Sequence, residues 1–115
     1  MAGAVVLTAS ALFLTGVLPA ASSTVEVTIA TGPGESMVFS PSVVAVPADA
    51  TIRVAFENVS SEAHNLTFQA PISVATRTIV EPGEGDVVTF RTPGPGAYTF
   101  VCTIHIDMTG SLQVH

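Results

Sequence analysis

The chain reads AYTFVCTIHIDM at residues 97–108, where an alternating strand runs directly into a cluster of metal-binding side chains. Phe100 and Cys102 share one face of this strand, because side chains in a strand alternate with a period of two. Cys102, His105 and Met108 then follow at intervals of three. A thiolate, an imidazole and a weak axial thioether, joined by a second imidazole, form a blue-copper electron-transfer site. The spacing therefore predicts a metal site where this strand ends.

The second imidazole is available upstream at His64, which shares a strand face with Phe68. A histidine in such a place is often a hydrogen-bonded core residue, but the downstream cluster favours a ligand. Asn65 lies next to it, and its amide could tie the His64 segment to the Thr103 loop. Cys102 is the only cysteine in the chain, so an internal disulfide is excluded.

Short alternating segments separated by turn residues extend over the rest of the chain. We expect strands at 24–29, 37–46, 51–58, 65–69, 76–80, 86–92, 97–102 and 110–114. The second of these is interrupted by Ser40-Pro41-Ser42, which should bend it or place it at a sheet edge. Seven or eight short strands with no convincing helix favour an all-β sandwich or barrel.

The N-terminal segment differs from the rest of the chain. Residues 1–23 contain no charged residue, and an apolar run at 4–18 is followed by the small-residue tract PAASS. This order is typical of a secretory signal, although the basic n-region is missing. We expect residues 1–23 to be a signal peptide or an uncleaved membrane anchor, with a strand of the domain as the least favoured alternative. Residues 24–115 form the predicted single domain.

All charged residues lie in that predicted domain. Nine are acidic and three are basic, which gives a formal net charge of −6. Such a domain should repel nucleic acids and anionic membranes. It should favour a redox partner with a basic docking face.

These residues resemble those of the cupredoxins, a family of small blue copper proteins. The resemblance covers nearly all of residues 25–114 and includes FSP at 39–41, FEN at 56–58, PGAYTFVC at 95–102 and MTGSL at 108–112. The Cys-x2-His-x2-Met spacing has the length of the amicyanin ligand loop, whereas plastocyanin is similar elsewhere but has a longer loop. The resemblance implies a Greek-key β-sandwich of seven or eight strands. It also implies one type 1 copper ion at one end, held by His64, Cys102, His105 and Met108.

The chain departs from the family pattern within the ligand loop. Ile104 stands where Pro is frequent, and Ile106 and Asp107 stand where amicyanin-like loops carry Pro and Phe. The departures leave the ligands intact but change the expected docking surface. Ile104 and Ile106 would form an apolar docking rim around His105.

The function expected from these features is one-electron transfer between redox partners. We expect an exported monomer in the periplasm or on the outer face of the cytoplasmic membrane, in contact with the membrane only if residues 1–23 stay attached. The alternative is a copper chaperone or storage protein of the same fold. A metal-free sandwich is less favoured. We expect no enzyme and no catalytic residues, because a second copper site needs more histidines and only His115 is left over.

Overall fold

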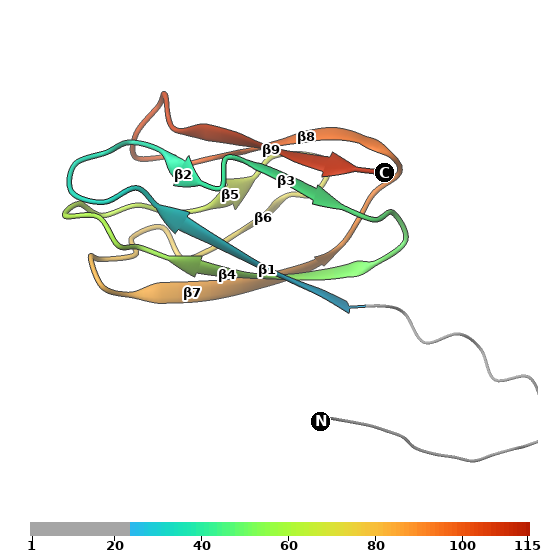
Figure 1. The fold of residues 1–115 in the computed structure, drawn as a ribbon, viewed down its shortest axis with the longest axis horizontal. Coiled ribbons are helices and arrows are strands. Elements are labelled where there is room, and N and C mark those ends of the chain that lie inside the picture. The colour runs from blue at the N-terminus through green and yellow to red at the C-terminus, as the bar shows by residue number, and fades with distance from the viewer. Residues whose placement is uncertain (1–23) are drawn as a thin grey trace, which may run out of the picture.

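The computed structural model describes residues 24–115, and this part of the chain contains strands and no helix (Figure 1). The strands are β1 (Thr24–Thr31), β2 (Phe39–Ser40), β3 (Val43–Val46), β4 (Thr51–Glu57), β5 (Thr67–Phe68), β6 (Val74–Ala75), β7 (Gly85–Arg91), β8 (Gly96–Val101) and β9 (Thr109–Val114). The signal or anchor segment predicted at 1–23 lies outside the described residues. Within residues 24–115, we find no helix with the length and apolar character needed to cross a membrane.

The nine strands form two mixed sheets. One has the order β2-β1-β4-β7 and the other has the order β3-β9-β8-β5-β6. In Figure 1, β8 and β9 lie in one layer, and β4 and β7 lie in the other. The pairs β1–β4 and β3–β9 are parallel, whereas β4–β7 and β8–β9 are antiparallel. The predicted all-β Greek-key sandwich is confirmed, with nine strands in place of seven or eight.

Alternation along each strand explains how the two sheets face each other. In β4, the side chains of Ile52, Val54 and Phe56 are buried, whereas those of Arg53 and Glu57 are exposed. A strand with one buried face and one wet face shows this period of two. Burial of the apolar face supplies the main favourable term in folding.

Phenylalanine rings join the two layers beneath one end of the sandwich. The ring of Phe100 in β8 lies 5.2 Å from that of Phe39 and 5.3 Å from that of Phe68, measured between centroids. Phe39 also meets Phe56 of β4 at 6.4 Å. Tilted and edge-to-face contacts at these distances are favourable for aromatic pairs. Phe100 lies two residues before Cys102, so this cluster supports the end of the strand that carries the cysteine.

Two expected strands differ in the structure. The segment expected at 37–46 as one strand that bends or lies at a sheet edge is divided at Ser40-Pro41-Ser42 into β2 and β3. These two strands belong to different sheets, and each lies at the edge of its sheet, as the second alternative predicted. Pro41 cannot donate a ladder hydrogen bond, so it suits a point where the chain leaves a sheet. The strand expected at 76–80 is wrong, because the pairing strand is β6 at Val74–Ala75. The Thr76 N–H still bonds to the Leu66 carbonyl at 2.9 Å, but the next N–H, that of Arg77, donates to the side chain of Asp86 at 2.9 Å.

Candidate metal centre

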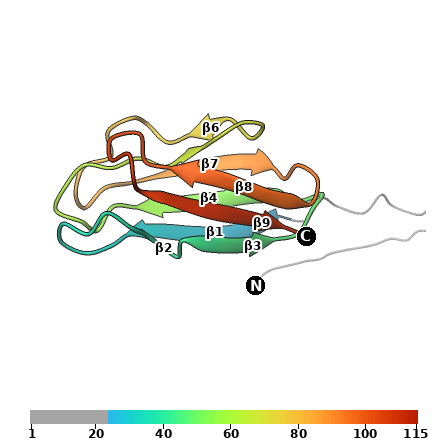
Figure 2. The same cartoon turned by 90° about the horizontal axis from the view of Figure 1, so that it is seen from above.

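The four predicted ligands come from two connections at the same end of the sandwich. His64 lies between β4 and β5, and Cys102, His105 and Met108 lie between β8 and β9. Both views show these connections, green and red respectively, at one end of the molecule (Figures 1 and 2). His64 and Met108 are fully buried, and Cys102 is 2% exposed. His105 is partly exposed.

The β8–β9 loop closes on itself through backbone hydrogen bonds. The Cys102 N–H donates to the Met108 carbonyl at 3.0 Å, and the Met108 N–H donates to the His105 carbonyl at 3.0 Å. The bonds bring the two ends of the loop together, so the Cys102 and Met108 backbones are neighbours. Ile106 at the tip is 89% exposed.

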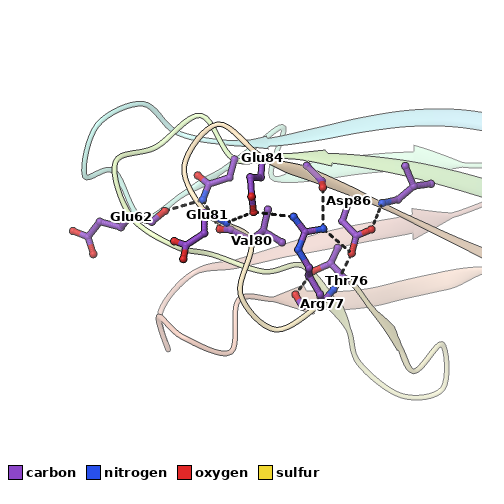
Figure 3. Close-up of polar contacts among 10 residues, drawn as sticks. Glu62, Thr76, Arg77, Val80, Glu81, Glu84 and Asp86 are labelled. Carbon is purple, nitrogen blue, oxygen red and sulfur yellow. Dashed lines mark hydrogen bonds and ion pairs between the residues drawn. The ribbon is translucent and has the colours of Figure 1, made fainter.

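The backbone of His64 is held by Val80. The His64 N–H donates to the Val80 carbonyl at 3.1 Å, and the Val80 N–H donates to the His64 carbonyl at 3.0 Å. The Val80 segment is held in turn by Arg77, whose guanidinium donates to Glu84 Oε1 at 2.9 Å (Figure 3). Hence the β6–β7 connection holds the backbone of His64, the predicted ligand from the β4–β5 connection.

The side chains of His64 and Cys102 meet in the interior. His64 Nδ1 lies 3.8 Å from Cys102 Sγ. With bond lengths typical of zinc, about 2.0–2.1 Å to nitrogen and 2.3 Å to sulfur, a trigonal angle of about 120° separates the two donor atoms by about 3.8 Å. The observed spacing fits two ligands of one metal ion.

The surroundings of His64 favour its neutral form over the charged form. Burial lowers the pKa of His64 below its usual value, and the nearby His105 lowers it further, whereas Glu62 acts in the opposite direction. The neutral imidazole is the form that binds a metal. Within residues 24–115, His64 Nε2 is a buried side-chain atom without a hydrogen-bond partner.

His105 lies beside this pair. Its ring centroid is 4.6 Å from that of His64, and its Nε2 is 3.2 Å from the Ala63 carbonyl oxygen. A carbonyl only accepts, so this contact is a hydrogen bond in the tautomer with the hydrogen on Nε2, and in that neutral tautomer the lone pair is on Nδ1. In the described part of the chain, no three His, Cys, Asp or Glu side chains are already gathered as a metal-binding group. The structure thus brings His64 and Cys102 together and places His105 and Met108 next to them.

The tie expected between Asn65 and Thr103 is present. Asn65 Nδ2 donates to Thr103 Oγ1 at 2.7 Å, and the Thr103 N–H donates to Asn65 Oδ1 at 3.1 Å. The Asn65 N–H also points at Cys102 Sγ, 3.5 Å away. These contacts fix the His64 segment to the start of the ligand loop.

The sequence prediction missed two groups around the site. One is the Ala63 carbonyl, which has no signature in the sequence because every residue has such an oxygen. The other is Asn58, which is buried and bonded to the Glu62 and Val80 carbonyls. Asn58 continues the inward positions of β4 by two residues after Phe56, and a polar residue at an inward position needs hydrogen-bond partners. The inward position of Asn58 in the alternating pattern is therefore a sequence signal that could have identified it.

A family model described as a cupredoxin-like domain matches residues 3–114. The chain belongs to the cupredoxin-like family. This confirms the family expected from the sequence motifs.

Solved structures similar to this cupredoxin include two auracyanins and a plastocyanin. Reduced auracyanin from the photosynthetic bacterium Roseiflexus castenholzii has a TM-score of 0.69 and 25% identity, over 82% of this chain and 99% of its own. Auracyanin A from Chloroflexus aurantiacus, a "blue" copper protein, has a TM-score of 0.70 and 20% identity, over 81% of this chain and 100% of its own. Oxidised plastocyanin from Dryopteris crassirhizoma has a TM-score of 0.59 and 24% identity, over 76% of this chain and 99% of its own. A search of the curated proteins found no match.

Membership of the cupredoxin-like family supports the expected cofactor, one type 1 copper ion. The donor set fits that ion, because copper in such sites takes two imidazoles, a thiolate and a weak thioether. The apolar rim expected around His105 lies on the surface: Ile104 is 39% exposed and Ile106 is 89% exposed.

Proposed function

We propose that this cupredoxin is a mononuclear blue copper electron carrier, which shuttles single electrons between redox partners outside the cytoplasm. His64, Cys102, His105 and Met108 would hold the ion. The observation that carries the proposal is the buried contact of His64 Nδ1 with Cys102 Sγ at 3.8 Å. When bound, copper would supply the Cu(II)/Cu(I) couple.

The residues of the chain would keep the ligands in place in both oxidation states. The Cys102–Met108 backbone bond closes the loop, and the Asn65–Thr103 bonds attach it to the His64 segment. Burial of three of the ligands excludes water from the site. A rigid, dry site needs little rearrangement when its charge changes.

His105 is the proposed ligand nearest to solvent, so it is the side chain through which we expect contact with a partner. Ile104 and Ile106 surround it with apolar surface suited to a small, transient interface. Glu62, Glu81 and Glu84 lie on loops at the same end of the molecule (Figure 3). Their charge would attract a basic docking face. We propose that the protein acts as a monomer.

A copper chaperone or storage role is less well supported. Delivery of an ion requires ligands that exchange with a partner, and exposed ligands exchange more easily than buried ones. Here Cys102 is 2% exposed and Met108 is 0% exposed. An enzyme with a second copper site would need further histidines, and His115 is the one histidine of the sequence outside the proposed ligand set.

The test is the visible spectrum of the purified full chain after addition of Cu(II). We expect an intense absorption band toward the red end, because charge transfer from a thiolate to Cu(II) gives type 1 sites their colour. Cys102→Ser should abolish the band, since a hydroxyl is a poor substitute for a thiolate. His115→Gln, which changes the histidine outside the proposed site, should retain it. A Cys102→Ser protein that stays blue would show that the ligand assignment is wrong.

A further inference from the structure

Asn58 is a buried polar residue directly after β4. The preceding inward residues of this strand, Ile52, Val54 and Phe56, are apolar, and Asn58 itself is 1% exposed. A buried amide without partners is destabilising, so its contacts should explain its presence.

The side chain of Asn58 is fully hydrogen-bonded. Nδ2 donates to the Glu62 carbonyl at 2.8 Å and to the Val80 carbonyl at 2.8 Å. Oδ1 accepts from Thr31 Oγ1 at 3.1 Å, from the Ser60 N–H at 3.0 Å and from Ser60 Oγ at 2.7 Å. One amide therefore joins the end of β1, the β4–β5 connection and the β6–β7 connection. Figure 3 shows Glu62 and Val80 in this network.

The two carbonyls that Asn58 binds flank His64. Glu62 lies two residues before His64 in the chain. The Val80 carbonyl is the same oxygen that accepts the His64 N–H at 3.1 Å. The Asn58 amide and the His64 amide therefore share one acceptor, and Asn58 restrains the His64 backbone from two sides.

The imidazole of His64 lacks the usual side-chain restraint. A metal-binding histidine almost always donates its second N–H to a carbonyl, a carboxylate or a water, which fixes the ring orientation. Within residues 24–115, His64 Nε2 has no such partner. Its orientation toward Cys102 must therefore come from packing and from the position of its backbone.

We propose that Asn58 is the positioning residue for His64: it fixes the backbone that aims Nδ1 at Cys102 Sγ. This inference rests on the proposed copper function, because the position matters only if His64 is a ligand. Asn58 acts on His64 through its hydrogen bonds to the Glu62 and Val80 carbonyls.

The experiment compares Asn58→Asp with Thr92→Val in the full chain. Asn58→Asp keeps the shape of the side chain but replaces the donor of both carbonyl bonds with an acceptor. Thr92→Val is the matched control, because Thr92 Oγ1 bonds to the Ala50 backbone away from the proposed site. We measure hydrogen exchange of the His64 and Val80 amides without copper, then the affinity for Cu(II) and the visible and EPR spectra.

We expect Asn58→Asp to speed exchange of the His64 amide by about tenfold relative to the β4 ladder. It should also weaken Cu(II) binding by about 10–100-fold and alter the EPR spectrum. Thr92→Val should change none of these readouts. If Asn58→Asp fails to fold, Ser60→Ala serves in its place: it removes a hydroxyl whose single hydrogen lies within reach of Asn58 Oδ1 and of the Glu62 carbonyl. Its effects should have the same direction and be about threefold.

Two failures are distinguishable. A wild-type protein that never turns blue overturns the proposed function. A blue wild type whose His64 exchange and copper affinity respond to the Asn58 or Ser60 variant no more than to Thr92→Val overturns the positioning role alone.

Discussion

Met108 is the proposed ligand with the weakest donor atom, and it is completely buried. Its backbone N–H and carbonyl bond to His105 and Cys102, so its position is set by the loop and does not depend on a strong bond to metal. A long axial thioether tunes the reduction potential more than it holds the ion. Soft sulfur favours Cu(I) over Cu(II), so an oxygen donor at this position should shift the balance toward Cu(II).

Met108→Gln should keep copper and colour but lower the reduction potential. We expect a decrease of more than about 60 mV, which is a tenfold change for a one-electron couple. A redox titration that follows the visible band measures it. Met37→Gln is the control, because Met37 is 37% exposed in the β1–β2 connection. Loss of copper from Met108→Gln, with Met37→Gln unaffected, would contradict the axial role.

Among the elements, the long strands are predictable from sequence and the short ones are not. Alternation defines which face of β4 or β7 is buried, and both strands lie where the pattern places them. Alternation does not indicate which strand is the pairing partner. The sequence pattern therefore could not show that β2 and β3 belong to different sheets. Strand β6 is two residues long and is defined by its pairing with β5, whereas just after it the Arg77 N–H bonds to the side chain of Asp86, nine residues away.

The same limit applies to the metal centre. The spacing of Cys102, His105 and Met108 is local, so a sequence displays it, and parity indicates that His64 points inward. The hydrogen bond from His105 Nε2 to the Ala63 carbonyl joins two connections and involves the backbone. A backbone carbonyl can accept at any residue type, so only the structure identifies the Ala63 carbonyl as this acceptor.

The turn before β7 offers a test of one element. The Arg77 side chain lowers the pKa of Glu84 by hydrogen bonding, as does the Glu81 N–H. A carboxyl whose pKa is lowered by folding contributes stability above its usual value of 4.5, and this contribution is lost as the pH falls through the lowered value. Arg77→Gln should therefore lower the melting temperature at pH 7, by a few degrees at most because the pair is exposed.

The difference between wild type and Arg77→Gln should shrink as the pH falls to about 3 and as salt rises. Thermal unfolding at several pH values measures it. Arg53→Gln removes the exposed pair with Glu26 on the β1–β4 sheet and is the control away from this turn. An Arg77→Gln effect that stays constant from neutral to acidic pH would contradict the electrostatic explanation.

Over the whole molecule, the apolar surface proposed for docking and the negative charge are distributed differently. The apolar rim is local, on the loop that carries His105. The charge is distributed: each of the three arginines pairs with an acidic side chain, and the chain keeps a formal net charge of −6. Steering by distributed charge is screened over about 10 Å at 0.1 M salt, whereas apolar contact at short range is not.

Charge steering and apolar contact should affect the rate of electron transfer to a basic cytochrome in different ways. Wild type should react faster at low salt than at high salt. Glu81→Gln should slow the reaction only at low salt, because it weakens steering alone. Ile106→Glu should slow it about tenfold at every salt concentration, because it places a charge in the apolar contact.

The control is Ala97→Glu, which adds the same charge at the exposed start of β8, at the opposite end of that strand from Cys102. It should leave the high-salt rate unchanged. Stopped-flow measurements across a salt series decide between these outcomes. A high-salt rate that Ile106→Glu does not change would mean that electrons leave by a route other than the surface around His105.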